Sequence, residues 1–263
     1  MTFTVSVNTD IVFGESDPRD AVDAVADAGA EALEYWGIES TDRAALREAC
    51  DERGLDISAS TCLGVAGNSG GEGPSMTDPD LHEEAVSDLE RSVELAAEVG
   101  IGSMIVTVGP DRNLPPGTEH RAIVRALRGA APAAEEAGVN LVLEPLNLPV
   151  DHAGYYLDSS YEAYEIVDAV DSPNVGVLFD VYHQQITEGN VIQNITEHVE
   201  FIDYVHVADV PGRHEPGTGE LNYGNVFAAI DDAGYEGYVG LEYSPSDGAD
   251  PAETVGDVLD MAP

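Results

Sequence analysis

Short runs of apolar residues alternate with longer amphipathic segments along the whole chain. Eight runs have the length and the β-branched content of strands buried on both faces. They span residues 2–8, 32–35, 56–61, 103–108, 140–144, 175–180, 202–208 and 238–242. The segments between them carry apolar residues at helical spacing, over residues 20–28, 42–53, 81–99, 119–136, 160–170, 191–198, 226–233 and 252–261. Several helical segments end at a glycine, as at Ala28-Gly29 and Val99-Gly100, which is typical of helix C-termini.

This alternation predicts a parallel sheet covered by helices. Eight strand–helix units favour a closed (β/α)₈ TIM barrel over an open doubly wound sheet, and the 263 residues suit one barrel domain spanning 1–263. No Gly-x-Gly-x-x-Gly motif follows the first strand, which argues against dinucleotide binding. Two long irregular segments, 64–80 and 146–159, follow the third and fifth strands. In a barrel such loops lie at the catalytic face.

Ligand-type side chains stand at the ends of the last four predicted strands. The fifth strand ends at Glu144, the sixth at Asp180 and the eighth at Glu242, and the seventh carries His206 near its end. Because a barrel brings the carboxyl ends of its strands to one face, we expect these four groups to converge at the mouth. Glu34, near the end of the second strand, is expected across the mouth, in either a substrate-side or a structural role.

Three carboxylates brought together repel one another, and a divalent cation between them removes that repulsion. Two glutamates, one aspartate and one histidine favour Mn²⁺ or Mg²⁺ over Zn²⁺, which prefers more nitrogen or sulfur ligands. Such an ion can bind carbonyl and hydroxyl oxygens and stabilise an enediolate, while a carboxylate carries a proton between adjacent carbons. The pattern therefore predicts one metal ion, and the residues fit an enzyme that isomerises a small hydroxy-carbonyl compound. Two facing glutamates would also permit epimerisation, and the residues leave that choice open.

The net charge of the chain indicates the salt concentration in which the protein works. It holds 51 acidic residues against 10 basic ones, all of them arginine, for a net charge of −41. A domain of this kind usually carries a net charge of about 2–8. At several molar salt the screening length falls below about 3 Å and the self-repulsion largely disappears. Because the acids are spread along helices rather than gathered in a tail, we interpret the composition as halophilic rather than as that of an acidic interaction protein. Nucleic acid is a disfavoured partner.

Nothing in the sequence indicates targeting or membrane insertion. The first eight residues resemble a strand and lack the basic region of a signal peptide. No run reaches the roughly 18 apolar residues of a membrane helix. Cys50 and Cys62 have no metal-ligand spacing and suit a reducing compartment. We therefore expect a cytoplasmic protein that binds a small-molecule substrate and no membrane, with a homo-oligomer (dimer or tetramer) left open.

Four stretches resemble the hydroxypyruvate isomerase family, within the xylose-isomerase-like barrel superfamily of sugar isomerases and epimerases. They are Leu143-Glu-Pro-Leu-Asn147, Phe179-Asp-Val-Tyr-His183, the run from His206 to Glu220, and Gly240-Leu-Glu-Tyr243. The run Pro211-Gly-Arg-His-Glu-Pro-Gly-Thr-Gly-Glu220 is the most specific, whereas the others occur across the superfamily, including ketose 3-epimerases. The resemblance covers nearly the whole chain in order and is thinner in the first half. It implies a barrel enzyme of carbohydrate metabolism.

The resemblance also implies roles for single residues. Glu144 and Glu242 fall on the proton-transferring pair, which also touches the metal, and Asp180 and His206 fall on the other metal positions. Close hydroxypyruvate isomerases more often carry Gln at the position of His206, whereas ketose epimerases carry His.

Two further residues fall on positions that bind substrate oxygens in related enzymes. These are His183, just past the sixth strand, and Arg213, in the Pro/Gly-rich loop after the seventh. The chain carries Ser244 where close isomerases often have Lys, so a carboxylate substrate has one cation fewer near the mouth.

Other functions remain to be considered, both among isomerases and epimerases and in other classes of protein. A 2-oxo-tetronate isomerase or a ketose 3-epimerase could use the same site. Apurinic endonucleases use a related barrel, but they need a His-rich multi-zinc centre and a basic DNA face, and the sequence shows neither. A binding protein without catalysis has no reason to keep two glutamates and an aspartate at one barrel mouth.

Overall fold

A computed structural model describes residues 1–14, 17–69 and 73–263. In this part of the chain eight parallel strands close into a barrel in sequence order, with β8 paired to β1. The strands are β1 (Thr4–Asn8), β2 (Ala32–Glu34), β3 (Asp56–Thr61), β4 (Ser103–Val106), β5 (Asn140–Leu143), β6 (Val175–Asp180), β7 (Ile202–Val207) and β8 (Tyr238–Leu241). The predicted (β/α)₈ barrel is thereby confirmed.

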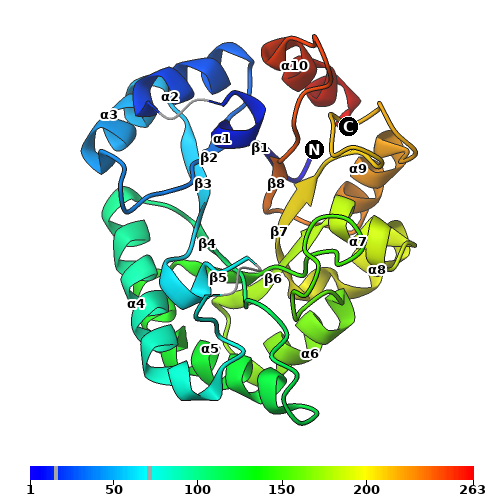
Figure 1. The fold of residues 1–263 in the computed structure, drawn as a ribbon. Coiled ribbons are helices and arrows are strands. Elements are labelled where there is room, and N and C mark those ends of the chain that lie inside the picture. Colours follow the sequence, from blue (N-terminus) through cyan, green and yellow to red (C-terminus); the bar gives the residue numbers. More distant parts are fainter. Residues whose placement is uncertain (15–16, 70–72) are drawn as a thin grey trace.

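Helices form an outer ring around the strands (Figure 1). They are α1 (Thr9–Val12), α2 (Pro18–Asp27), α3 (Arg43–Arg53), α4 (His82–Val99), α5 (Thr118–Ala137), α6 (Ser160–Val170), α7 (Val181–Thr187), α8 (Val191–His198), α9 (Tyr223–Asp232) and α10 (Pro251–Met261). Among the residues described, every helix is too short or too polar to cross a lipid bilayer.

Each strand buries both of its faces, which explains why the strands are apolar runs rather than alternating ones. One face packs against the helices, as Val177 and Phe179 of β6 do. The other face points into the barrel, where Leu178 of β6 and Tyr204 of β7 pack together with Ala59, Ile105 and Val142. The lower barrel is therefore a filled core, and the polar chemistry lies above it at the strand ends.

Many of the acidic residues begin helices. The side chains of Asp17, Asp42 and Asp250 accept hydrogen bonds from backbone N–H groups in the first turns of α2, α3 and α10. An aspartate at this position satisfies otherwise unpaired N–H groups and interacts favourably with the helix dipole. Part of the negative charge is thus used in local structure.

Two helices follow strands directly and were not among the predicted elements. Helix α1 begins after Asn8, whose side chain accepts from the backbone N–H of Ile11, and α7 begins after Asp180. As a result, His183 lies in the first turn of a helix and is fully buried.

The two long irregular segments follow β3 and β5, as predicted. Segment 64–80 contains two short 3₁₀ helices, η1 (Gly64–Ala66) and η2 (Pro79–Leu81), and its residues 70–72 lie outside the described part of the chain. Segment 146–159 contains neither helix nor strand.

Candidate active site

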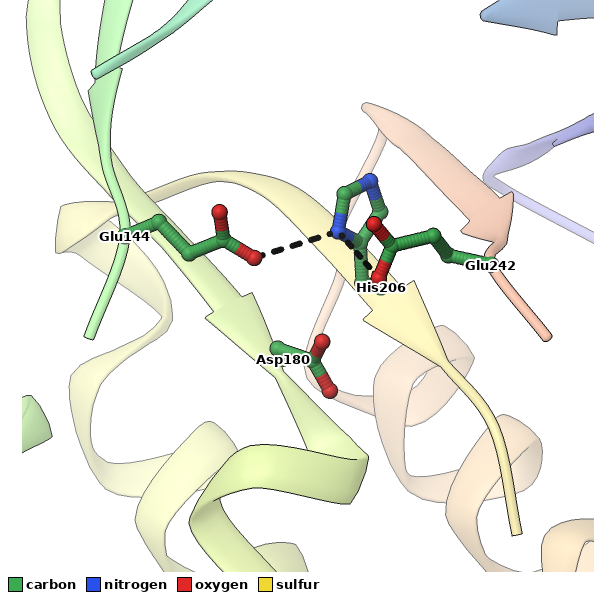
Figure 2. A group of neighbouring side chains, drawn as sticks. All are labelled: Glu144, Asp180, His206 and Glu242. Carbon is green, nitrogen blue, oxygen red and sulfur yellow. Dashed lines mark ion pairs between the residues drawn. The ribbon is translucent and has the colours of Figure 1, made fainter. Parts of the chain in front are cut away.

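Four strands deliver the side chains of Glu144, Asp180, His206 and Glu242 to one point at the barrel mouth (Figure 2). Asp180 is the last residue of β6, His206 is the penultimate residue of β7, and the glutamates directly follow β5 and β8. One possible ligand atom from each residue lies within 4.8 Å of those of the other three, and all four residues are buried. The structure therefore brings together the four groups that the strand ends predicted, while their roles stay predictions.

The imidazole of His206 is oriented for a cation. Its Nε2 lies 2.8 Å from Oε2 of Glu34, and its Nδ1 has no hydrogen-bond partner in the described structure. Nδ1 faces Oε1 of Glu144 at 3.4 Å and Oε2 of Glu242 at 3.6 Å, as the dashed lines in Figure 2 mark. A buried nitrogen without a hydrogen-bond partner, together with three buried carboxylates, forms a donor set that suits a hard divalent cation. The residues present therefore fit a metal ion.

Electrostatics in this cluster are strongly coupled. Burial raises the pKa of Glu144 to about 7, with further upward contributions from Glu242 and Asp180, while His206 acts in the opposite direction. Burial lowers the pKa of His206, but the carboxylates of Glu34 and Glu242 outweigh it and hold that pKa well above its ordinary value. Either a proton on His206 or a metal cation would thus partly neutralise the excess negative charge of these carboxylates.

Asp180 connects the cluster to helix α7. Its Oδ1 accepts hydrogen bonds from the backbone N–H groups of Tyr182 at 2.7 Å and of His183 at 3.1 Å, which makes it the N-cap of the helix. Its Oδ2 lies 3.5 Å from Nε2 of His183. The same residue therefore fixes the start of α7 and belongs to the cluster of four ligand-type side chains.

His183 is held with one nitrogen toward the site. Its Nδ1 faces the side-chain Nδ2 of Asn147 at 2.7 Å and the backbone N–H of that residue at 3.3 Å. Because a backbone N–H can only donate, Nδ1 accepts and Nε2 carries the hydrogen. Burial and the positive charge of Arg213 lower the pKa of His183 well below its ordinary value, so it is a neutral hydrogen-bond donor. Sequence reasoning gave Asn147 no role, although it lies inside one of the motifs.

Arg213 reaches the cluster from the loop after β7. Its guanidinium forms an ion pair with Oε2 of Glu242 and lies over the ring of Tyr182, 5.4 Å from the ring centre. Its predicted contact with substrate stays a prediction, but its position at the mouth is compatible with it.

A cavity of about 210 Å³ opens beside these groups. Its lining includes Glu144, Glu242, His183 and Arg213. The other lining residues are apolar, small or polar without formal charge, namely Trp36, Thr61, Gly67, Ser69, Ile105, Thr107, Leu146 and His152. A larger hollow of about 900 Å³ lies against α4 and contains none of the four clustered residues. The small cavity is therefore the one that matches the chemistry.

Glu34 lies beside the cluster on the inner side of β2. It is completely buried, and its Oε2 is 2.8 Å from Nε2 of His206. It is not among the described residues that line the cavity, so the structure favours the structural role, which stays a prediction.

Comparison with known proteins agrees with this geometry. A family model described as "Xylose isomerase-like TIM barrel" matches residues 22–262. The 2-oxo-tetronate isomerase of Pectobacterium atrosepticum is 32% identical over 245 residues, covering 91% of each chain. The hydroxypyruvate isomerase of Escherichia coli K12 is 29% identical over 244 residues, covering 91% of this chain and 93% of that one.

Solved structures share the architecture. A structure titled AP endonuclease, family 2, from Brucella melitensis has a TM-score of 0.89 at 23% identity, covering 99% of this chain and all of that one. D-Allulose 3-epimerase from Methylomonas sp. has a TM-score of 0.80 at 18% identity, covering 98% of this chain and 96% of that one. At these identities the likeness shows the fold alone. The family match over most of the chain goes further: the chain belongs to the xylose isomerase-like TIM barrel family.

Proposed function

We propose that this isomerase moves a proton between neighbouring carbons of a small hydroxy-carbonyl substrate such as hydroxypyruvate or a 2-oxo-tetronate. The observation that carries the proposal is the convergence of three carboxylates and the imidazole of His206, with one possible ligand atom of each within 4.8 Å of the others, beside a cavity of about 210 Å³. Relatives named for these two substrates extend over nine-tenths of the chain and support the choice.

The donor set proposed for a metal consists of Glu144, Asp180, His206 and Glu242. A divalent cation held there, Mn²⁺ or Mg²⁺, supplies positive charge to substrate oxygens as negative charge develops on them. The fit rests on the partnerless Nδ1 of His206 and on the excess of negative charge, both described above.

Glu144 and Glu242 are proposed as the groups that carry the proton. Both residues line the cavity, where a positioned carboxylate can take up a proton from substrate and return it. Removal of a proton from the carbon next to the carbonyl gives an enediolate. Return of a proton to the former carbonyl carbon, with transfer of the hydroxyl proton between the two oxygens, completes the isomerisation without loss or gain of atoms.

The remaining site residues orient the substrate. The Nε2–H of His183 is a donor whose direction is fixed by Asn147, and it points toward the cluster. Arg213 brings a second set of donors beside Glu242. We propose that these two residues hold substrate oxygens while the glutamates move the proton.

Epimerisation is the second candidate. The two glutamates come from β5 and β8 and approach His206 from different sides (Figure 2). A proton removed by one glutamate could return from the other to the same carbon, which inverts that carbon. A ketose 3-epimerase would use the cavity in this way.

A substrate screen at high KCl tests the proposal. Metal-depleted protein is supplied with Mn²⁺ or Mg²⁺ and tested on hydroxypyruvate, 2-oxo-tetronates and ketoses of four to six carbons. We expect metal-dependent conversion of at least one class, and the product distinguishes isomerisation from epimerisation. Absence of conversion in all three classes, or conversion indifferent to metal, would contradict it.

A further inference from the structure

We propose that Glu34 is the positioning residue of the metal centre: it keeps the hydrogen of His206 on Nε2, so that Nδ1 is free to bind a cation. This inference rests on the proposed metal site. It concerns a residue to which the family resemblance assigned no role, on a strand that contributes no ligand.

Both carboxylate oxygens of Glu34 contact nitrogen atoms of neighbouring side chains. Oε1 accepts hydrogen bonds from Nδ2 of Asn8 and from Nε1 of Trp36, both at 2.6 Å, and Oε2 faces Nε2 of His206 at 2.8 Å. An indole N–H can only donate. The amide of Asn8 is also fixed, because its Oδ1 accepts from the backbone N–H of Ile11 at 3.0 Å.

The side chains that contact the carboxylate of Glu34 do so through nitrogen atoms. Two hydrogen bonds occupy Oε1, and Oε2 lies at hydrogen-bonding distance, 2.8 Å, from Nε2 of His206. Because a carboxylate accepts hydrogen bonds, this geometry assigns a hydrogen to the facing Nε2 of His206.

The consequence appears at the other nitrogen of His206. In a neutral imidazole with its hydrogen on Nε2, the Nδ1 lone pair points outward. That lone pair faces the carboxylates of Glu144 and Glu242. Metal-binding histidines commonly donate their second N–H to a carboxylate, which fixes the ring and raises its basicity. Glu34 stands in that position.

Glu34 also connects the metal centre with the substrate cavity. The indole of Trp36 lines the cavity, and its Nε1–H bonds to the same carboxylate. The backbone N–H of Trp36 is held separately by Asp10 at 2.9 Å. The orientation of this cavity wall and the orientation of His206 therefore depend on one side chain.

The first measurement is Mn²⁺ affinity by calorimetry at high KCl, which needs no substrate. Glu34→Gln keeps the size but presents an amide that cannot accept from all three donors, and we expect Mn²⁺ to bind about 10–100-fold more weakly. Glu31→Gln is the matched control: it removes the same charge from an exposed residue three positions earlier, and its affinity should equal that of the wild type.

A double variant separates positioning from a general structural effect. Because Glu34 acts through His206, Glu34→Gln should cost no further affinity in a His206→Gln background. Additive losses would mean that Glu34 supports the site in another way and would overturn the inference. Equal affinity of wild type and Glu34→Gln would overturn it as well, and leave the proposed metal site intact.

If Glu34→Gln does not fold, a spectroscopic measurement on the wild type still tests the inference. Long-range ¹H–¹⁵N NMR of the Mg²⁺-loaded protein reports which imidazole nitrogen carries hydrogen, and His206→Gln identifies the signal. We expect hydrogen on Nε2 and none on Nδ1. Hydrogen on Nδ1 would refute the positioning role, whereas a wild type that binds neither Mn²⁺ nor Mg²⁺ would refute the proposed metal site and the inference together.

Discussion

At the scale of single residues, we predict that Asp180 serves both as the cap of α7 and as a metal ligand, through different oxygens. Oδ1 caps α7, and Oδ2 lies 3.5 Å from Nε2 of His183. Asp180→Asn keeps an oxygen for the cap but removes the charge, so we expect metal affinity to fall by about tenfold or more, because ligand charge tunes affinity. Added Mn²⁺ should partly restore the rate. Asp180→Ala loses the cap as well, and its melting temperature should fall by the equivalent of about 1 kcal/mol. An Asp180→Asn variant with unchanged metal affinity would contradict this division.

Asp203, which lies outside the candidate active site, should make the stability of the fold depend on pH. Burial raises its pKa to about 6, and it has no hydrogen bond or ion pair within the described residues. Above that pKa the folded state holds a partly buried charge, which lowers the free energy of unfolding. This loss of stability is relieved as the pH falls from about 6 toward the ordinary pKa near 4. Asp203→Asn should therefore raise the stability at pH 8 by about 1–3 kcal/mol and have little effect at pH 4.

Any lost negative charge relieves repulsion in this chain, so the Asp203 experiment needs a matched variant. Asp257→Asn removes the same charge from an exposed residue on α10. Denaturant unfolding at fixed high KCl compares the two across pH. A gain that is the same for both variants at every pH would show that burial of Asp203 has no effect.

The sequence did not predict which residues orient the clustered side chains. The four clustered side chains could be predicted, because each stands at a strand end of a recognisable barrel. Glu34 and His206 lie 172 positions apart, and no spacing rule connects them. Asn147 is likewise 36 positions from His183. These pairings arise only when the barrel closes.

At the scale of elements, β8 makes room for the ring of His206 on β7. A Cβ atom at Gly240 would lie 2.8 Å from Cδ2 of His206 and 3.0 Å from the ring of Tyr204. Gly240→Ala should therefore displace His206 and weaken Mn²⁺ binding by about tenfold, in line with the effect of disturbing a ligand's support. Calorimetric titration measures this directly.

Helix α10 offers the control for the glycine substitution. A Cβ at Gly256 would meet nothing within 4 Å, so Gly256→Ala should leave Mn²⁺ affinity unchanged and stabilise the helix by about 0.5–1 kcal/mol. If Gly240→Ala binds Mn²⁺ as the wild type does, the strand does not hold His206 in the way described.

Element prediction succeeded where periodicity was long and failed where it was short. The eight strands and the major helices follow from apolar runs and amphipathic segments. Helices α1 and α7 have four and seven residues, too few to show a repeating apolar face. Their starts are set by capping from Asn8 and Asp180.

At the scale of the whole molecule, ten arginines cannot neutralise 51 acidic residues. Several ion pairs, such as Arg19–Glu52 and Arg91–Glu94, are solvent-exposed and contribute little each. We predict that the folded state is lost when KCl is dialysed to low ionic strength, because the excess acids then repel unscreened. Circular dichroism and melting temperature follow the change. Equal melting temperatures in high and low salt would contradict the halophilic interpretation.

The central claim concerns the whole active site: a metal held by four strands, with Glu144 and Glu242 carrying the proton. The most direct measurement is exchange of the substrate's α-proton with D₂O, followed by NMR at high KCl with Mg²⁺, on a substrate found by the screen. Positioned acid–base groups contribute about 10²–10⁴-fold. Glu144→Gln and Glu242→Gln should each lose exchange by about that factor while still binding Mg²⁺. Glu236→Gln, the same change at an exposed residue before β8, should exchange as the wild type does. If both active-site variants exchange the proton at the wild-type rate, the glutamates are not the bases and the account is wrong.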